Sequence, residues 1–288
     1  MGVALLVIGI LAIIGVSIWY GWWAKKKRQE ALAIAARQLG LQYSPVDTFN
    51  CLGLPFGLFS RGDGRGTENV LWGTWQNLNL REFEYWYYEE TTDSEGHTSR
   101  SYSHFSCVVT EIPMQSAGLS ITKENIFTRF ADHVGLRDIE FESEQFNRAY
   151  NIKSRDKKFA NDVVDARMMQ WLMQSGEGYA FEMNGPYVLV YCKRRRPNEL
   201  APLLGSLQQY IGHIPKVAYS LHGDAAAAAR MYGTAPEGAP QPGGSPLPPP
   251  AGPPVAGGPM PPEGAMPPPP LGPAVPPPAS PGPGSFQP

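Results

Sequence analysis

This 288-residue sequence has few cysteines, almost no excess of charge of either sign and no recognisable catalytic motif. Its three cysteines, Cys51, Cys107 and Cys192, lie far apart, and none belongs to a CxxC pair. Because the number is odd and the spacing wide, they predict no disulfide framework and favour reduced thiols in a cytoplasmic setting. The 24 basic and 26 acidic residues leave a net charge of −2, which excludes a general attraction to nucleic acid.

Local signatures of an enzyme are missing as well. The five histidines form neither an HExxH sequence nor a zinc-finger spacing, and there is no GxSxG elbow or dinucleotide fingerprint. The glycines of residues 62–66 lack the Lys-Ser/Thr ending of a P-loop, so this segment predicts a turn. We therefore predict no catalytic residue, metal ligand or cofactor. A site assembled from distant residues would leave no local trace, so a membrane-tethered enzyme is kept as the alternative.

The sequence does contain one long apolar run, at its N-terminus. No charged residue occurs from residue 3 to residue 23, and about 20 apolar residues in a helix rise roughly 30 Å, the thickness of a bilayer core. We predict that residues 1–24 form a single-pass transmembrane helix. Four basic residues follow it: Lys25, Lys26, Lys27 and Arg28. A cleaved signal peptide would carry its basic residues before the apolar run instead.

The residues at the end of the run predict its orientation. The positive-inside rule places the basic cluster, and everything after it, in the cytoplasm, with the N-terminus outside the cell. Aromatic residues typical of a membrane–water interface gather at the same end: Trp19, Tyr20, Trp22 and Trp23. The predicted location is therefore the cell membrane with a cytoplasmic domain. The same domain facing outside the cell is the alternative.

The rest of the sequence divides into three parts. Residues 25–42 predict a basic juxtamembrane helix or stalk, because apolar residues recur at helical spacing up to Gly40. Residues 43–222 predict a globular α+β domain, mostly antiparallel sheet packed with two or three helices. Residues 223–288 fall to Ala, Pro, Gly and Met, which predicts a disordered tail. Its proline runs at 248–250 and 267–270 either dock on a protein that binds Pro-rich motifs or serve as a spacer.

Local patterns predict the elements of the domain. In residues 78–89 the aromatic side chains at 83, 85 and 87 are expected to face the core, and Glu82, Glu84 and Trp86 to face partly outward. These aromatic strands are interpreted as a β core or, alternatively, as a patch that binds a ligand or partner. Asn184-Gly185 between two apolar runs predicts a tight hairpin. Expected strands cover residues 54–59, 69–75, 78–89, 101–112, 137–142, 146–152, 179–183 and 187–192, and expected helices cover 122–133, 156–164, 165–176 and 198–214.

Five short motifs resemble those of a known family. They are LPF at 54–56, NVLWGTW at 69–75, FNRAYNIKSRD at 146–156, FAND at 159–162 and DARMM at 165–169. Together they resemble a family of bacterial membrane-anchored proteins that contain a domain of unknown function, over residues 43–214. The resemblance implies a membrane-anchored domain, but it implies no catalytic residue, substrate or cofactor.

A second basic cluster, at residues 194–196, ends the predicted hairpin. Next to anionic inner-leaflet lipid each basic side chain contributes on the order of 1 kcal/mol, so we predict that both clusters contact lipid head groups. The alternative is a solvated strand end. The predicted function is a non-catalytic binding or scaffolding module at the cytoplasmic membrane surface, with the lipid bilayer as partner. The predicted contacts are Lys25, Lys26, Lys27, Arg28, Arg194, Arg195 and Arg196.

Overall fold

The structure, a computed structural model, describes residues 2–123, 135–176 and 178–223, with the side chains of residues 2–5 and 8 left out. These residues belong to a unit that ends at Ala239, and a second unit, 240–288, lies outside them. The predicted disordered tail and its proline runs therefore lie outside the described residues, except for Gly223. Most of the helix predicted at 122–133 lies outside them too, and Thr122 itself belongs to a strand.

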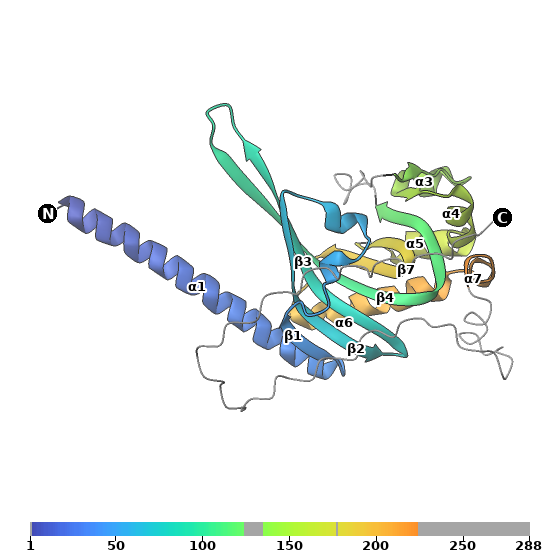
Figure 1. The fold of residues 1–288 in the computed structure, drawn as a ribbon, viewed down its shortest axis with the longest axis horizontal. Helices are drawn as coiled ribbons and strands as arrows, with labels where there is room; N and C mark the ends of the chain where they lie inside the picture. Colours follow the sequence, from blue (N-terminus) through green and yellow to red (C-terminus); the bar gives the residue numbers. More distant parts are fainter. Residues whose placement is uncertain (1, 124–134, 177, 224–288) are drawn as a thin grey trace, which may run out of the picture. The chain divides into compact units, whose positions relative to one another are not determined.

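In the described part of the chain, seven strands form one antiparallel sheet (Figure 1). Its order is β1-β2-β3-β4-β6-β5, and β7 pairs with β4. The 26-residue strand β4 holds the sheet together, because β3 pairs with its first half, β6 with its last residues, and β7 along its other edge. The strands are β1 (Gln42–Val46), β2 (Gly64–Trp75), β3 (Leu78–Thr92), β4 (Thr98–Lys123), β5 (Arg137–Asp138), β6 (Tyr150–Ser154) and β7 (Ala180–Lys193).

The central part of this sheet is covered on both faces, whereas residues 89–102, at the outer end of the β3–β4 hairpin, are exposed. On one face, Leu32 and Ala36 of helix α1 (Gly2–Gln38) join a core with Leu71, Leu80 and Val108 of the strands. On the other face, the short 3₁₀ helices η1 (Cys51–Gly53) and η2 (Gly57–Ser60) cover the predicted aromatic core at positions 83, 85 and 87. The prediction that Glu82 and Glu84 face outward is wrong, since their face is covered.

Three helices lie where the sequence predicts them. The Asp156 side chain caps α4 (Lys157–Val163), and the Asp165 side chain caps α5 (Ala166–Ser175). These caps confirm the two predicted helices and the stop of the second at Gly176. The closing helix is confirmed as η4 (Pro197–Glu199) followed by α6 (Leu200–His213). The short helix α7 (Lys216–His222) was not predicted.

Three predicted strand features are wrong. Residues 54–59 are not a strand, because the chain there runs from η1 to η2 over the aromatic face. Residues 146–152 begin as helix α3 (Glu144–Ala149), capped by Ser143, and only then enter β6. Asn184-Gly185 makes no hairpin, because the segments before and after it pair with β4 and form the single strand β7. Of the strand predicted at 137–142, only β5 forms.

Helix α1 covers the predicted membrane span from Gly2 and the predicted stalk, residues 25–42, as far as Gln38. It continues without a break to Gln38, and Gly40 ends it with a φ of 72°. Its C-terminal part is buried on the sheet, whereas apolar side chains between residues 6 and 23 are exposed, Ile18 to 69%. Among the residues whose side chains are described, no helix has both the length and the apolarity needed to cross a membrane. The span predicted for residues 1–24 is not confirmed and stays a prediction.

Candidate functional site

The two basic clusters predicted from the sequence meet in the structure. Lys25 and Arg28 of α1 and Arg194, Arg195 and Arg196 after β7 line one cavity of about 480 Å³, together with Gly21, Ala24, Glu68 and Asn69. We call this cavity the basic junction. It forms where α1, which contacts β1 and β2, packs against η4, the element that follows β7. Its lining therefore begins on the exposed apolar part of α1 and ends on the sheet.

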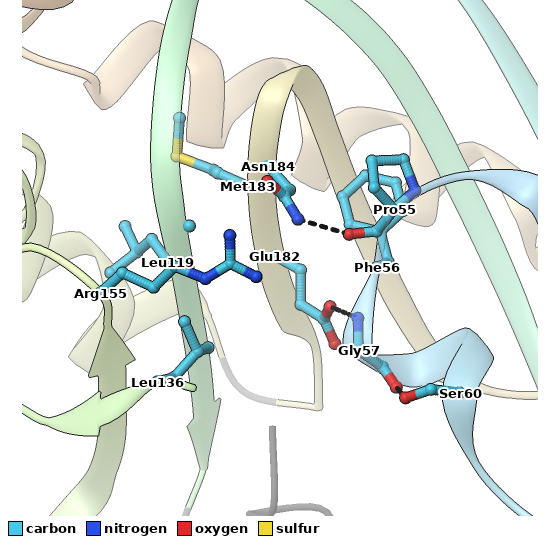
Figure 2. Close-up of a pocket in the computed structure, with 11 residues that line it drawn as sticks. Pro55, Phe56, Gly57, Ser60, Leu119, Leu136, Arg155, Glu182, Met183 and Asn184 are labelled. Atoms are coloured by element: carbon cyan, nitrogen blue, oxygen red, sulfur yellow. Dashed lines mark hydrogen bonds between the residues drawn. The ribbon is translucent and has the colours of Figure 1, made fainter. Parts of the chain in front are cut away.

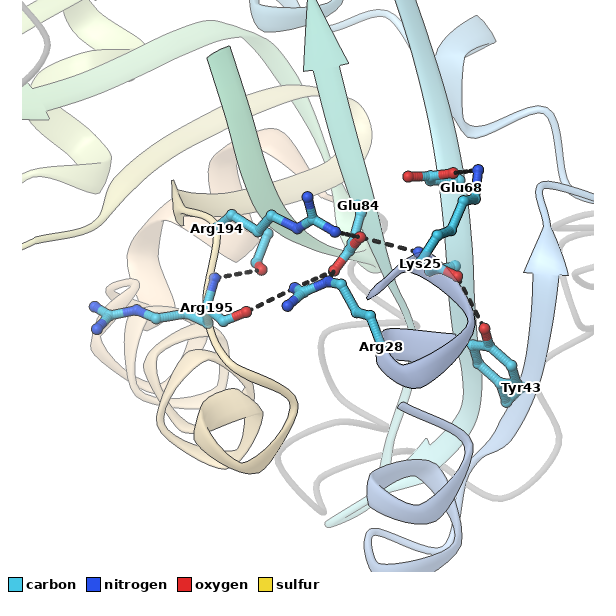
Figure 3. Close-up of polar contacts among 9 residues, drawn as sticks. Lys25, Arg28, Tyr43, Glu68, Glu84, Arg194 and Arg195 are labelled. Atoms are coloured by element: carbon cyan, nitrogen blue, oxygen red, sulfur yellow. Dashed lines mark hydrogen bonds and ion pairs between the residues drawn. The ribbon is translucent and has the colours of Figure 1, made fainter. Parts of the chain in front are cut away.

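A buried carboxylate beside the basic junction pairs with two of its arginines (Figure 3). The side chain of Glu84 on β3 is 4% exposed and accepts hydrogen bonds from Arg28 of α1, with a distance of 2.7 Å from Nε. Its other oxygen pairs with Arg194 at 3.0 Å and accepts from the Asn69 amide at 2.9 Å. One carboxylate thus ties together three segments that are far apart in the sequence.

The backbone shape of β2 explains how Asn69 reaches this carboxylate. Asn69 has a left-handed φ of 57° and lies where the pairing of β2 with β3 shifts register. Such a bulge re-aims a side chain, here toward Glu84. The Asn69 oxygen then accepts a hydrogen bond of 2.8 Å from the Tyr43 hydroxyl of β1. The polar network is therefore continuous from β1 to the end of β7.

Arg28 also contacts the segment that carries the second basic cluster. Its Nη2 donates to the backbone oxygen of Arg195 at 2.7 Å. The Arg195 backbone N–H in turn donates to the Ser106 hydroxyl of β4 at 3.0 Å. The Arg195 side chain points elsewhere, with its guanidinium 5.6 Å from the ring centre of Tyr179. The position of residues 194–196 is therefore set by contacts with both α1 and the sheet.

Glu82, two residues before Glu84 on the same face of β3, is a second buried carboxyl. It is 0% exposed, and neither of its oxygens has a hydrogen-bond partner among the described residues. Burial, reinforced by the charge of Glu84 and opposed by Arg28, raises the pKa of Glu82 well above its usual value. Burial therefore favours the neutral form of Glu82 beside the charged network.

The basic junction keeps a positive charge after its internal pairs are counted. Five cations line it, while the carboxylates of Glu68 and Glu84 pair with Lys25, Arg28 and Arg194, so three positive charges remain. Lys25 lies 2.7 Å from Glu68. Outside the lining, Lys26 and Lys27 are exposed and lie over the rings of Trp22 and Trp23, at 5.5 and 5.9 Å from the ring centres.

The structure therefore separates the seven predicted contact residues into two groups. Arg28 and Arg194 are part-buried partners of Glu84 and act within the fold, whereas Lys25 is exposed and pairs with Glu68. Lys26, Lys27 and Arg196 are exposed, and Arg195 is half-buried. Sequence reasoning missed Glu68, Glu82 and Glu84. The sequence signal that could have indicated buried carboxylates is the alternation of Glu82 and Glu84 with aromatic residues in one strand.

The described residues contain no group of three or more His, Cys, Asp or Glu side chains that could hold a metal ion. All three cysteines are buried and free. Burial raises the pKa of the Cys107 and Cys192 thiols, which disfavours the reactive thiolate. The cationic side chains of the basic junction can attract anionic groups.

Comparisons with known proteins give no family. No protein-family model and no curated protein sequence matches the chain. Among solved structures, the fold resembles the crystal structure of the mycobacterial trehalose monomycolate transport factor A, TtfA, with a TM-score of 0.47 and 12% identity. The match covers 65% of this chain and 96% of the other. The resemblance of residues 43–214 to bacterial membrane-anchored proteins of unknown function stays a prediction.

Proposed function

We propose that this protein is a non-catalytic binding or scaffolding module that α1 holds at the cytoplasmic face of the cell membrane. The observation that carries the proposal is the composition of the basic junction. Gly21 and Ala24, at the end of the exposed apolar part of α1, line the same cavity as residues 194–196. A bilayer that covers the apolar part of α1 would bring its head groups to this cavity.

The outward-facing cations would be the groups that contact anionic head groups. Lys26, Lys27 and Arg196 are exposed and do not pair with Glu84. At about 1 kcal/mol each, three cations contribute about 3 kcal/mol, or roughly a hundredfold preference for anionic over zwitterionic lipid at low salt. Because exposed charges are screened, this preference would fall at high ionic strength.

The test measures which lipids surround the full-length protein. The protein is inserted into vesicles of equal phosphatidylglycerol and phosphatidylcholine and extracted with its lipid shell by a styrene–maleic acid copolymer, and the lipid ratio is measured. We expect enrichment of phosphatidylglycerol for the unmodified protein. The Lys26→Gln/Lys27→Gln/Arg196→Gln variant should return the ratio toward that of the vesicle.

A matched triple variant controls for the loss of charge alone. Arg148, Lys157 and Lys158 are exposed basic residues that do not line the basic junction, so their change to Gln should leave the enrichment intact. An unchanged lipid ratio in the first variant would show that the outward cations do not recognise head groups. Orientation is tested separately, because protease added to intact cells should spare a cytoplasmic domain and would digest one that faces outside.

A further inference from the structure

A second cavity, of about 190 Å³, lies where strands β4 and β7 both depart from regular pairing (Figure 2). Their register shifts twice between Glu111 and Leu119, and Gly118 adopts a φ of 100° there. A side chain at this glycine would be strained and would lie 3.6 Å from the Arg155 Cδ. The irregular pairing therefore opens a space between β4, β7, η2 and the segment after β6.

Arg155 is the cationic residue of this cavity. Its backbone N–H is bonded to the Gly118 oxygen at 3.3 Å, while its guanidinium has no hydrogen-bond or ion-pair partner among the described residues. Figure 2 shows the side chain reaching across the cavity toward Glu182. A guanidinium held over a cavity in this way is suited to bind a planar oxyanion through two parallel hydrogen bonds.

Glu182 of β7 forms the buried acidic side of the cavity. It is 4% exposed and accepts a hydrogen bond of 2.9 Å from the Gly57 N–H. Tyr191 and Cys107 are the titratable groups beside it, and Arg61 supplies a favourable positive charge. Burial outweighs the hydrogen bonds and Arg61, and it raises the pKa of Glu182 to about 7.

The charges of the lining residues favour an anion when Glu182 is protonated. Arg155 and Glu182 cancel when Glu182 is ionised, and the one positive charge of Arg155 remains when Glu182 is neutral. The volume is below the roughly 300 Å³ at which sites for drug-sized ligands begin, so the cavity suits a small polar group. A cation would face the Arg155 guanidinium instead.

We propose that this cavity binds a small oxyanion, a carboxylate or a phosphate group, on the guanidinium of Arg155, and that protonation of Glu182 strengthens the binding. The site is separate from the basic junction and does not depend on the proposed membrane role. If only the form with neutral Glu182 binds, a pKa of about 7 makes the affinity fall about tenfold between pH 6 and pH 8.

The test is calorimetric titration of the full-length protein in detergent micelles with acetate, inorganic phosphate and glycerol 3-phosphate at pH 6 and pH 8. Sodium chloride at matched ionic strength and methylammonium chloride serve as reference ligands. Arg155→Gln should weaken oxyanion binding at least tenfold. Lys158→Gln, which removes a nearby charge outside the cavity, should leave it unchanged.

Glu182→Gln separates this proposal from a general effect of pH. The amide keeps the shape of the neutral acid, so the variant should bind at pH 8 as well as the unmodified protein binds at pH 6. Heats no larger than those of sodium chloride at both pH values would refute the site. Binding that survives Arg155→Gln would refute the role of the guanidinium, and binding of glycerol 3-phosphate alone would restrict the ligand to lipid-like head groups.

Discussion

Replacing Glu182 with Gln should stabilise the protein in a way that depends on pH. The carboxyl is 4% exposed, and its pKa is raised from 4.5 to about 7 by burial. The folded state therefore holds this proton more tightly than the unfolded state. The stability from this group is fully present below pH 4.5 and is lost as the pH rises to about 7. At 1.36 kcal/mol per pH unit the loss is about 3 kcal/mol.

Glutamine cannot ionise, so the variant avoids this loss. Its free energy of unfolding should match that of the unmodified protein near pH 4.5 and exceed it by about 3 kcal/mol at pH 8. For a domain of this size the gain corresponds to roughly 6 to 12 °C in the unfolding temperature. The contribution of Glu82, whose pKa is also raised, is common to both proteins and cancels in the difference.

The assay is thermal and urea-induced unfolding of the full-length protein in micelles, followed by tryptophan fluorescence between pH 4.5 and pH 8.5. Glu144→Gln is the control, because that side chain is 86% exposed and pairs with exposed Arg148. Its stability curve should run parallel to that of the unmodified protein. A difference between Glu182→Gln and the unmodified protein that does not change with pH would contradict the reasoning.

Three further substitutions test other parts of the fold. Glu84→Gln leaves two arginines beside an uncharged side chain, and losing one partner of a part-buried charge network costs about 3 to 5 kcal/mol. Urea unfolding should show this loss, and an unchanged midpoint would show that Glu84 does not hold α1 on the sheet. Gly62→Ala should destabilise by about 1 to 3 kcal/mol, because φ is 71° and the new Cβ would lie 2.6 Å from the Tyr88 backbone oxygen. Gly205→Ala inside α6 meets nothing within 4 Å and should stabilise by about 0.5 to 1 kcal/mol, and equal effects of the two changes would contradict this account.

Elements with a strong local signal were predictable from the sequence. The strands expected at 69–75, 78–89 and 101–112 all form, each longer than expected. The helix expected from Asp165 to Gly176 begins and ends where its cap and its glycine place it. In these segments the side-chain periodicity and the capping groups agree with the tertiary packing. The local sequence is therefore sufficient to predict the element.

The Asn184-Gly185 hairpin failed because pairing with a distant strand overrides the local turn signal. Both flanking segments find partners on β4, which is long enough to pair with all of β7. Gly185 keeps the positive φ that such a turn requires, at 55°, but the strand continues through it. The Asn184 amide donates to the Pro55 oxygen instead of closing a turn. Asn184 and Gly185 thus keep the properties of turn residues but lie within an irregular strand.

Glu82 and Glu84 could not be placed from the sequence for a related reason. Alternation in β3 predicts one buried and one solvated face, and it correctly identifies Phe83, Tyr85 and Tyr87 as core residues. Whether the second face is solvated depends on α1, which precedes β3 by about forty residues and is invisible to a local pattern. The pairing of the two basic clusters around one carboxylate is hidden for the same reason, since Arg28 and Arg194 are 166 positions apart.

The buried ion pairs of Glu84 restrict how the N-terminal helix α1 can move relative to the sheet. Because α1 is continuous from its exposed apolar part to Leu32 and Ala36 in the core, no loop separates the proposed anchor from the sheet. Arg28 and Glu84 then fix the rotation of this helix about its axis, since a turn of the helix would move the guanidinium away from a carboxylate that is 4% exposed. Under the proposed function, the face of the domain that meets a bilayer would therefore be set by an ion pair inside the fold, while the exposed Lys26 and Arg196 would contact the lipid head groups. Positioning of the helix and recognition of lipid would then fall to different members of the same two basic clusters.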